Sequence, residues 1–466
     1  MNTNAAMTLA GAIAQRAMET SIPAPVAFKE RIAAIDILRG VALLGLLLMH
    51  MPDFGLPATG FAPIVSGDRG SNFVIWLLSE ILVAGKLRAI FTMLFGASVV
   101  IFTTRGEERG PDAGDAGVAD LYCRRTLWLI GFGLLHAYFI WDGDVLFFYG
   151  VIGLMLFPWR KASAKALLIA ALALLVVGAM FTGMRARRYE EMRAKAATAD
   201  TAAAAGKTLS DGEREAQQAW AEARARFAPG PDIAAKDIAE HRVGYWAAFR
   251  HRGGLVAEDQ PRVLYRRGLF DEAVMMLFGM ALLKLGVFSA ARSRRFYAWM
   301  TLAGYGVGLA LTTYMTHREI ASHFDPVTTM SGYRLYDLDR LLVALGHIGL
   351  VMLIVKAGAL RPLTSRLAAV GRMALTNYLT HSIVCTLLFN GYGFGLYGKF
   401  QPYQLLYVTL ALWTFQLIVS PLWLRRFHFG PAEWLWRSLT YWRRQPMKIR
   451  ERLRVETAPV TSDGLV

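Results

Sequence analysis

RIAAIDILRGVALLGLLLMH, residues 31–50, is the stretch that decides the fold, because it begins with charge, becomes apolar and ends on a histidine. On a helix, residues spaced by three or four share a face. One face collects Asp36, Arg39, Gly40, Leu43, Leu47 and His50, and the opposite face collects Ile37, Val41, Leu44 and Leu48. A helix with so polar a face is not expected to contact lipid all round. We therefore predict a first membrane span whose polar face looks into a helical bundle.

The composition of the whole chain favours the same class. The 466 residues are 55% hydrophobic and the mean hydropathy is +0.35, whereas soluble chains average roughly 45–50% apolar residues. Apolar runs of about 20 residues, the length that crosses a bilayer, recur along the sequence. We predict an all-α integral membrane protein, a bundle of about ten transmembrane helices with one extramembrane helical insertion.

The predicted organisation has two membrane halves around a polar insertion. The segments are a cytoplasmic tail at 1–30, a five-helix half at 31–183, the insertion at 184–265, a second five-helix half at 266–424 and a basic cytoplasmic tail at 425–466. Within the insertion, Ser210 and Glu213 fit a helix capping box, and a second helix is expected at about 232–249. Residues 1–30 contain no continuous apolar core, so no cleavable signal peptide is expected.

Three apolar segments carry specific boundary predictions. The block at 73–102 is interrupted by Gly85, Lys86 and Arg88, which predicts a short helix, a break and then a span. The fifth span is expected at about 166–181 and the ninth at about 367–389.

The formal net charge of +16 is spread in short clusters between the apolar runs. Such clusters orient membrane proteins, whereas a nucleic-acid-binding surface would gather the charge in one patch. Basic residues fall in the loops at 103–125, 158–165, 289–295 and 356–366 and in the tail from Arg425. With an even number of spans, this distribution of basic residues places both termini in the cytoplasm. Because the positive charge is not gathered in one patch, nucleic acid is not the expected partner.

The two cysteines, Cys123 and Cys385, belong to different predicted helices. No Cys-x-x-Cys pair or Cys/His ligand spacing is present, so we expect neither a structural disulfide nor a metal site.

Ionisable residues cluster at the outer ends of the predicted spans and inside them. The ionisable ones include His136, Asp142, Asp144, Asp271, Glu272 and His381, and the polar amide of Asn377 lies one turn from His381. Because such residues are costly in a membrane, a functional role is the default hypothesis, and together they predict a polar cavity that opens outward. Structural roles stay open for each: an interfacial ion pair for Asp36 and Arg39, a buried hydrogen bond for His50, helix N-termini for the carboxylates and interhelical bonding for Asn377 and His381.

Several blocks of the chain resemble a known family. They are RIAAIDILRGVALLGLLLMH, GKLRAIFTMLFG, WDGDVLFFYGVIGL and the long block from GRMALTNYLTH to RSLTYWRRQPM. These strongly resemble the YeiB-like membrane proteins, whose C-terminal half carries domain-of-unknown-function family 418, over residues 31–447. That family in turn resembles a superfamily of transmembrane acyltransferases, which includes the heparan-glucosaminide acetyltransferases and the bacterial acyltransferase-three proteins. The latter carry an Arg, ten residues and a His in the first span, and Arg39 and His50 match that spacing.

The resemblance implies an acyltransferase of the bacterial inner membrane. The enzyme would take an acyl group from acyl-CoA on the cytoplasmic side. Acyl-CoA would be a co-substrate and not a resident cofactor. The acceptor would be a hydroxyl or amine of a glycan, lipid or small molecule at the outer face. His50 would act as general base, Arg39 would hold a donor phosphate and Asp36 would orient Arg39. Lys86 and Arg88 are weaker candidates for the phosphate.

On this hypothesis the acceptor site is lined by His136, Asp142, Asp144, Asp271, Glu272, Asn377 and His381. Two other functions stay open. The buried His and carboxylates could form the ion pathway of a transporter or channel, with the helix break near Gly85 beside it. Alternatively, the chain could be an envelope protein without turnover, in which the polar residues serve only the fold.

Overall fold

The structure is a computed structural model that describes residues 32–57, 67, 69–108, 114–263 and 270–449. The described residues form helices and no strand, apart from an isolated bridge between Phe427 and Lys448. The first half contains α2 (Ala33–Gly55), α3 (Ser71–Leu82), α4 (Lys86–Glu108), α5 (Gly114–Phe139), α6 (Leu146–Leu156), the 3₁₀ turn η4 (Phe157–Lys161) and α7 (Ala164–Ala204). The insertion adds α8 (Asp211–Phe227), α9 (Pro231–His241) and α10 (Tyr245–Val263). The second half contains α11 (Ala273–Lys284), α12 (Arg294–Ala321), α13 (Pro326–Gly332), α14 (Tyr336–Ala357), α15 (Arg361–Arg372), α16 (Ala374–Phe389), α17 (Pro402–Arg426) and α18 (Pro431–Thr440).

The predicted all-helical class is confirmed, and several helices suit a membrane. Five segments are long and apolar enough to cross one: Ala33–Gly55, Ser71–Glu107, Ala164–Ala204, Tyr336–Ala357 and Pro402–Arg426. Other helices of the bundle are shorter, such as α6, α11 and α16. Length and composition therefore identify five candidate spans where the sequence pattern predicts about ten.

The bundle is centred on α2 and α11. Between Ala273 and Ala281 every residue of α11 is buried, and this helix packs between α4 and α7 of the first half. A helix that is apolar all round needs such a site. On α2, Gly40 approaches α15 so closely that a Cβ would collide with the Leu367 carbonyl, and Gly371 on α15 meets the Asp36 carbonyl in the same way. The two halves therefore interlock in one bundle.

The predicted break near Gly85 and the capping box at Ser210 are both confirmed. Gly85 has a φ of +74° between α3 and α4, a conformation that favours glycine. The Ser210 side chain accepts from the Glu213 backbone N–H, and the Glu213 carboxylate accepts from the Ser210 N–H.

Other boundaries differ from the prediction. The helix expected at about 166–181 continues to Ala204, because its extension contains good helix formers and no proline. The helix expected at 232–249 is divided into α9 and α10 by a turn at 242–244.

The span expected at 367–389 is also divided, into the amphipathic α15 and the apolar α16. The cause is a distant carboxylate: Glu433 on α18 accepts from the backbone N–H groups of Leu375 and Thr376 at the start of α16. The helix α18 itself lies in the segment predicted to be only a basic tail.

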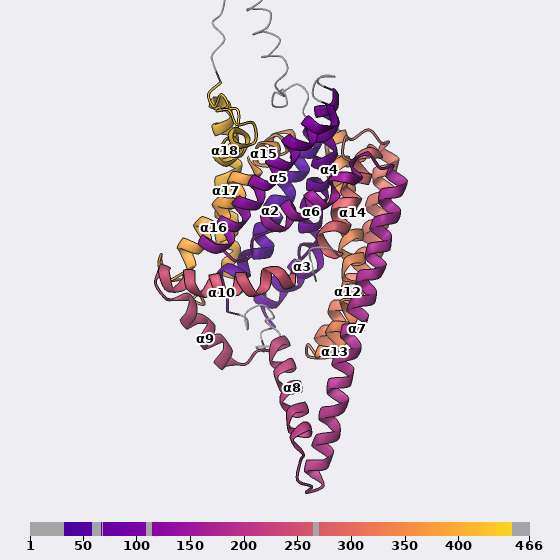
Figure 1. Cartoon of the computed structure of the whole chain (residues 1–466), viewed down its shortest axis with the longest axis vertical. Helices are drawn as coiled ribbons and strands as arrows, with labels where there is room; N and C mark the ends of the chain where they lie inside the picture. The colour runs from indigo at the N-terminus through magenta and orange to yellow at the C-terminus, as the bar shows by residue number, and fades with distance from the viewer. Residues whose placement is uncertain (1–31, 58–66, 68, 109–113, 264–269, 450–466) are drawn as a thin grey trace, which may run out of the picture.

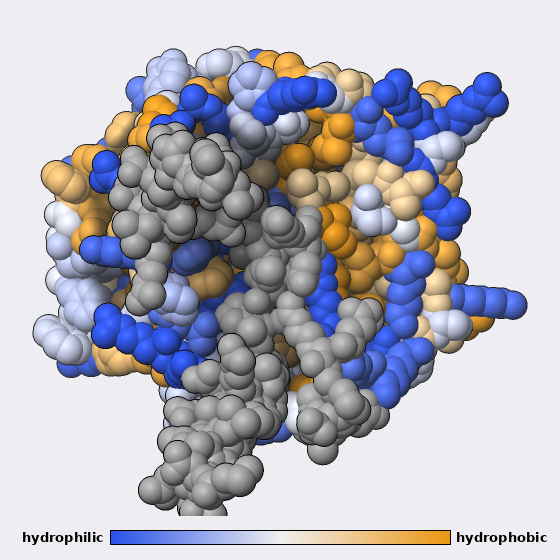
Figure 2. Space-filling view, turned by 90° about the horizontal axis from the view of Figure 1, so that it is seen from above, coloured by the Kyte–Doolittle hydropathy of each residue, from blue (hydrophilic) through white to orange (hydrophobic). Residues whose placement is uncertain are grey.

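The two ends of the bundle carry different elements (Figure 1). One end holds α15 and α18. At the other end α7 continues beyond the bundle, α8 returns beside it, and α9 and α10 lead back across the bundle. Seen from the α18 end, the molecule shows hydrophilic side chains around its rim with apolar patches between them (Figure 2).

Candidate functional site

A cavity of about 220 Å³ lies at the α18 end and is called the arginine cavity here. It is enclosed by α2, α4, α5, α6, α15, α16 and α18. Four arginines contribute to its lining, namely Arg39, Arg125, Arg372 and Arg437. The carboxylate in the lining is Glu433, which is already bonded to the start of α16. The lining of the cavity therefore contains more basic than acidic side chains.

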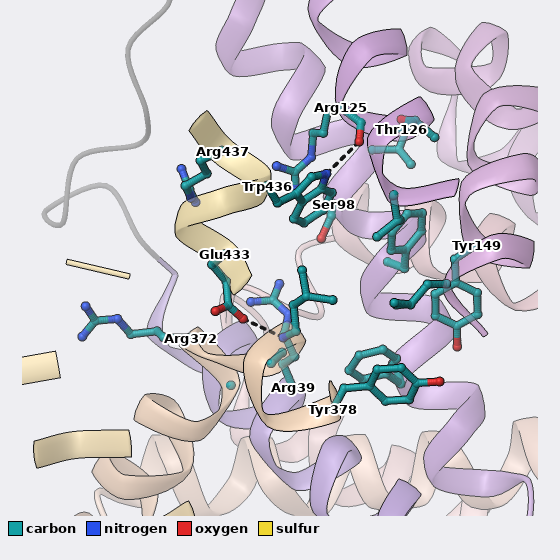
Figure 3. Close-up of a pocket in the computed structure, with 18 of the residues that line it drawn as sticks. Arg39, Ser98, Arg125, Thr126, Tyr149, Arg372, Tyr378, Glu433, Trp436 and Arg437 are labelled. Carbon is teal, nitrogen blue, oxygen red and sulfur yellow. Dashed lines mark hydrogen bonds between the residues drawn. The ribbon is translucent and has the colours of Figure 1, made fainter. Parts of the chain in front are cut away.

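The Arg125 guanidinium is positioned by a cation–π contact with Trp436. It lies 3.7 Å from the centre of the Trp436 ring, and the Trp436 indole N–H donates to the Arg125 carbonyl at 2.8 Å. No carboxylate of the described residues forms an ion pair with Arg125. Arg39, by contrast, donates to Asp36 at 2.8 Å. Figure 3 shows Arg125 and Trp436 at one end of the cavity, away from Tyr149 and Tyr378.

The arginine cavity adjoins a second cavity at the start of α6. Leu146, Tyr149 and Tyr378 line the arginine cavity, whereas the neighbouring Asp144 and Val145 line the second one. The Val145 N–H donates to the Tyr378 hydroxyl at 3.3 Å. We call Leu146, Tyr149 and Tyr378 the septum, because they separate two cavities that face opposite ends of the bundle.

The second cavity measures about 2120 Å³ and is called the large cavity. Its floor is formed by the end of α2, the break between α3 and α4, and the starts of α11 and α14. The rest is lined by the insertion helices α8, α9 and α10, the extension of α7, the helices α12 and α13 and the end of α16. Among the predicted residues, this cavity is lined by His50, Asp142, Asp144, Asp271 and Glu272, together with Arg88. The expected polar cavity is therefore present at the insertion end.

His50 lines the large cavity and is hydrogen-bonded to Asp53. Its Nδ1 lies 2.9 Å from the Asp53 carboxylate, and its Nε2 is buried without a hydrogen-bond partner in the described part of the chain. The ring packs edge-on to Trp141 with 4.9 Å between the ring centres. Asp53 fixes the ring and leaves Nε2 to act as base or acceptor.

His136 forms a second histidine–carboxylate pair, in which the carboxylate lines the large cavity and the histidine lines neither cavity. Its Nδ1 lies 2.9 Å from Asp144, and both side chains are almost fully buried. The other Asp144 oxygen accepts from the Phe147 N–H and so caps α6, while the His136 ring packs against Tyr378. In the loop before α6, burial raises the pKa of the Asp142 carboxyl, although Arg252 and His241 nearby oppose that change.

Arg88 is the centre of an ion-pair network across the floor of the large cavity. It donates to Asp271 at 2.7 Å and to Glu272 at 2.5 Å. Arg340 binds the same Asp271 and also Asp337. Arg88 is therefore neutralised at the floor of the large cavity and does not line the arginine cavity.

Lys86 is likewise at that end and is buried. Its ammonium donates to the Glu80 carbonyl at 2.8 Å and lies 3.6 Å from Asp339. Of the three residues proposed from sequence to hold a donor phosphate, Arg39 alone lines the arginine cavity.

Asn377 and His381 line neither cavity. Asn377 donates to the Ser420 hydroxyl at 3.1 Å, and His381 Nε2 lies 2.9 Å from the Gln416 amide oxygen. Both bonds join α16 to α17, which matches the interhelical role left open for these residues.

The sequence reasoning missed the residues that give the arginine cavity its character. Arg125 was counted only as part of a basic loop, and Trp436 and Arg437 were placed in a polar tail. The i, i+4, i+7 spacing of Ala432, Trp436 and Leu439 is the signal that indicates an amphipathic helix there. Asp53 was also missed, although its i+3 spacing from His50 was visible.

Residues 282–443 match the family model described as "Protein of unknown function (DUF418)". A DUF418 region is therefore present within the C-terminal half of the chain, at residues 282–443. This region supplies Arg372, Glu433, Trp436 and Arg437 to the arginine cavity, whereas Arg39 and Arg125 come from the first half. The cavity therefore lies where the DUF418 region meets the rest of the bundle.

The whole chain is also similar to curated relatives. It is 29% identical to "Uncharacterized protein YxaH" of Bacillus subtilis (strain 168), over 91% of this chain and 97% of the relative. It is 28% identical to "Uncharacterized protein YeiB" of Escherichia coli (strain K12), over 88% of this chain and 96% of the relative. The expected resemblance to the YeiB-like proteins, with a DUF418 region, is thus confirmed, and the similarity includes the first half.

Proposed function

We propose that this protein is a membrane acyltransferase that moves an acyl group from acyl-CoA in the arginine cavity to an acceptor in the large cavity. The observation that carries the proposal is the position of α2. This helix brings Arg39 to one cavity and His50 to the other, eleven residues or about 16 Å apart along its axis. A donor and an acceptor could thus approach the septum from opposite ends.

The arginine cavity suits the phosphate-bearing end of coenzyme A. Guanidinium groups bind phosphate oxygens in pairs of hydrogen bonds, and four arginines line this cavity. Trp436 offers an aromatic face in the same lining. The cavity is too small for the whole donor, so the acyl-bearing arm would extend through the septum towards His50. Rotation of the Tyr378 ring, whose hydroxyl accepts a long hydrogen bond from the Val145 N–H, would open this route.

The histidine pair suits the chemistry on the other side. Nε2 of His50 would take the proton from the acceptor hydroxyl or amine as that atom attacks the thioester carbonyl. The carbon–sulfur bond then breaks, the new ester or amide forms, and the thiolate leaves with the proton returned by the imidazolium. Asp53 would hold the Nδ1–H and stabilise the imidazolium, as a carboxylate does in other histidine-based transferases.

The proposal includes a membrane orientation. About ten helices would cross the bacterial inner membrane, with both termini and α18 in the cytoplasm and the insertion outside. The basic loops at span ends and the hydrophilic rim at the α18 end support this orientation. Short helices such as α6 and α11 would cross as buried or broken spans shielded by their neighbours.

The test is acyl transfer in inverted membrane vesicles supplied with radiolabelled acetyl-CoA, with the label counted in the lipid, glycan and small-molecule fractions. His50→Ala and His50→Asn should each abolish protein-dependent transfer, and Arg125→Met should raise the donor concentration needed. His317→Ala, at an exposed site on α12, is the matched control and should leave transfer unchanged. Undiminished transfer in both His50 variants would remove His50 from the mechanism.

A transporter is the second candidate, and the septum favours it. Two cavities that face opposite ends of a bundle and are separated by a few side chains also match alternating access. Proteoliposomes without any acyl donor distinguish the two functions. Substrate flux without a donor supports the transporter, whereas label transfer that needs acetyl-CoA supports the enzyme.

A further inference from the structure

A second group of ionisable side chains faces the large cavity, apart from the Arg88 network. Glu80 on α3, Glu319 on α12 and Asp339 on α14 line the cavity wall and interact electrostatically with one another. We call these three residues the carboxylate pocket. Lys86 lies behind them, almost fully buried.

The charges of this pocket are not balanced. In the neighbouring network, Arg88 and Arg340 pair with Asp271, Glu272 and Asp337. In the carboxylate pocket, Lys86 faces three carboxylates and forms its ion pair with Asp339 alone. Neither Glu80 nor Glu319 forms an ion pair through its carboxylate with any residue that the structure describes. With all three carboxylates ionised, the pocket would hold three negative charges against the single positive charge of Lys86.

The Asp339 carboxylate in this pocket is buried and only partly hydrogen-bonded. Its side chain is 1% exposed, and its Oδ2 accepts from the Thr312 hydroxyl at 2.7 Å. Its Oδ1 has no hydrogen-bond partner within the described ranges. A buried carboxylate oxygen without a donor is costly, so a donor from a bound molecule would stabilise it.

We propose that the carboxylate pocket binds the primary ammonium group of a ligand that occupies the large cavity. A primary ammonium carries one positive charge and three N–H donors, which match the unpaired oxygens and the excess charge. A metal ion fits less well, because the described residues contain no group of three or more His, Cys, Asp or Glu arranged to hold one.

The pocket is close enough to His50 to matter for the proposed reaction. The Gly85 N–H, next to Lys86, donates to the sulfur of Met49 at 3.3 Å, and Met49 precedes His50 on α2. A ligand anchored by its ammonium would present another part of itself to His50. The inference therefore names an amino-bearing molecule as the acceptor class. That last step rests on the proposed transferase, whereas the ammonium site itself does not.

The test is direct binding to the full-length protein in phosphatidylcholine nanodiscs, with dansylcadaverine as the fluorescent primary ammonium. Its N-acetylated derivative is the neutral probe of the same shape. Glu319→Gln and Asp339→Asn should each weaken dansylcadaverine binding by about tenfold, the expected loss for one charge-assisted hydrogen bond. Glu222→Gln, at a carboxylate of α8 that lines the same cavity, is the matched control and should bind as the wild type does.

Several results would overturn the ammonium site. The first is equal binding of the charged and the acetylated probe. The second is an equal loss of dansylcadaverine affinity in the Glu222 and Glu319 variants. The third is displacement of the probe by CaCl₂ but not by KCl at the same ionic strength. If Asp339→Asn fails to fold, Glu319→Gln decides alone, since the Glu319 carboxylate makes no side-chain hydrogen bond in the described structure. Coenzyme A binding is measured in the same samples. Intact coenzyme A binding without dansylcadaverine binding rejects the ammonium site only, and the reverse rejects the proposed donor site only.

Discussion

His50 and Asp53 form a hydrogen bond across one turn of α2, with 2.9 Å between Nδ1 and the carboxylate oxygen. The pair stands at the edge of the large cavity and leaves Nε2 buried and without a partner among the described atoms. The hydrogen bond within this helix turn thus fixes the orientation of the His50 ring. When Nδ1 carries the proton, Nε2 has the free lone pair and is the basic nitrogen.

Asp53→Asn should lower acyl transfer by roughly 10²–10⁴-fold while leaving coenzyme A binding unchanged. The amide can donate to Nδ1 and so favours the tautomer in which Nε2 carries the proton and cannot act as base. Initial rates at saturating acetyl-CoA measure the effect. Asp232→Asn on α9, at an exposed position, is the control. Equal rates for Asp53→Asn and the wild type would show that the carboxylate has no part in the reaction.

Arg125→Met should weaken coenzyme A binding by about tenfold or more, because it removes a cation from the arginine cavity. Trp436→Ala should give a similar loss, since the indole ring holds Arg125 in place. Titration calorimetry in nanodiscs measures both. Arg318→Met, an exposed arginine on α12 outside the cavity lining, controls for net charge. An equal loss in that control would mean that the binding depends on overall charge and not on this cavity.

The sequence predicts those parts of the fold that depend on local pattern. Apolar length and three- to four-residue spacing predict α2 and the polar cavity beside His50, and a single glycine with two basic residues predicts the break before α4. These features follow from the preferences of neighbouring residues, so a single sequence contains enough information for them.

The features that the sequence does not predict depend on contacts between distant segments. The division between α15 and α16 depends on Glu433, which is about 60 residues away in the chain and approaches only in the folded bundle. The arginine cavity combines Arg39 and Arg125 with Arg437 through the same docking of α18. The polar residues of α18 predict a solvated tail when the segment is considered alone. In the folded bundle the amphipathic face of α18 packs against α5 and α16.

Gly371→Ala should destabilise the protein by about 2–4 kcal/mol, because the new methyl group would collide with the Asp36 backbone carbonyl on α2. Backbone atoms on both sides cannot move without separating α2 from α15. Gly131→Ala on α5 is the matched control, since a Cβ there meets no atom within 4 Å. It should be neutral or slightly stabilising, as alanine favours a helix. Thermal unfolding in detergent, followed by helical circular dichroism, compares the two, and equal melting temperatures would contradict the close approach of α2 and α15.

The docking of α9 onto the bundle should weaken as pH rises, because the His241 ring loses its proton. Its ring stacks on Tyr397 at 3.9 Å, and Asp237 accepts from Tyr397 at 3.0 Å and lies 3.1 Å from His241 Nδ1. Burial opposes the charged ring, but Asp237, through its carboxylate and its carbonyl, raises the pKa of His241 above 6.5. Asp142 acts in the same direction from the loop before α6.

The sign of the pH effect follows from this raised pKa. The stabilisation is fully present below the unfolded-state value of about 6.5 and is lost as pH rises through the higher folded-state pKa. Hydrogen exchange of residues 231–241 should therefore be slower at mildly acidic pH than at alkaline pH, after correction for intrinsic exchange rates. His241→Gln should remove that difference, whereas His251→Gln, at the exposed histidine near Glu240, should retain it. A pH dependence that persists in His241→Gln would assign the effect to another group of the insertion.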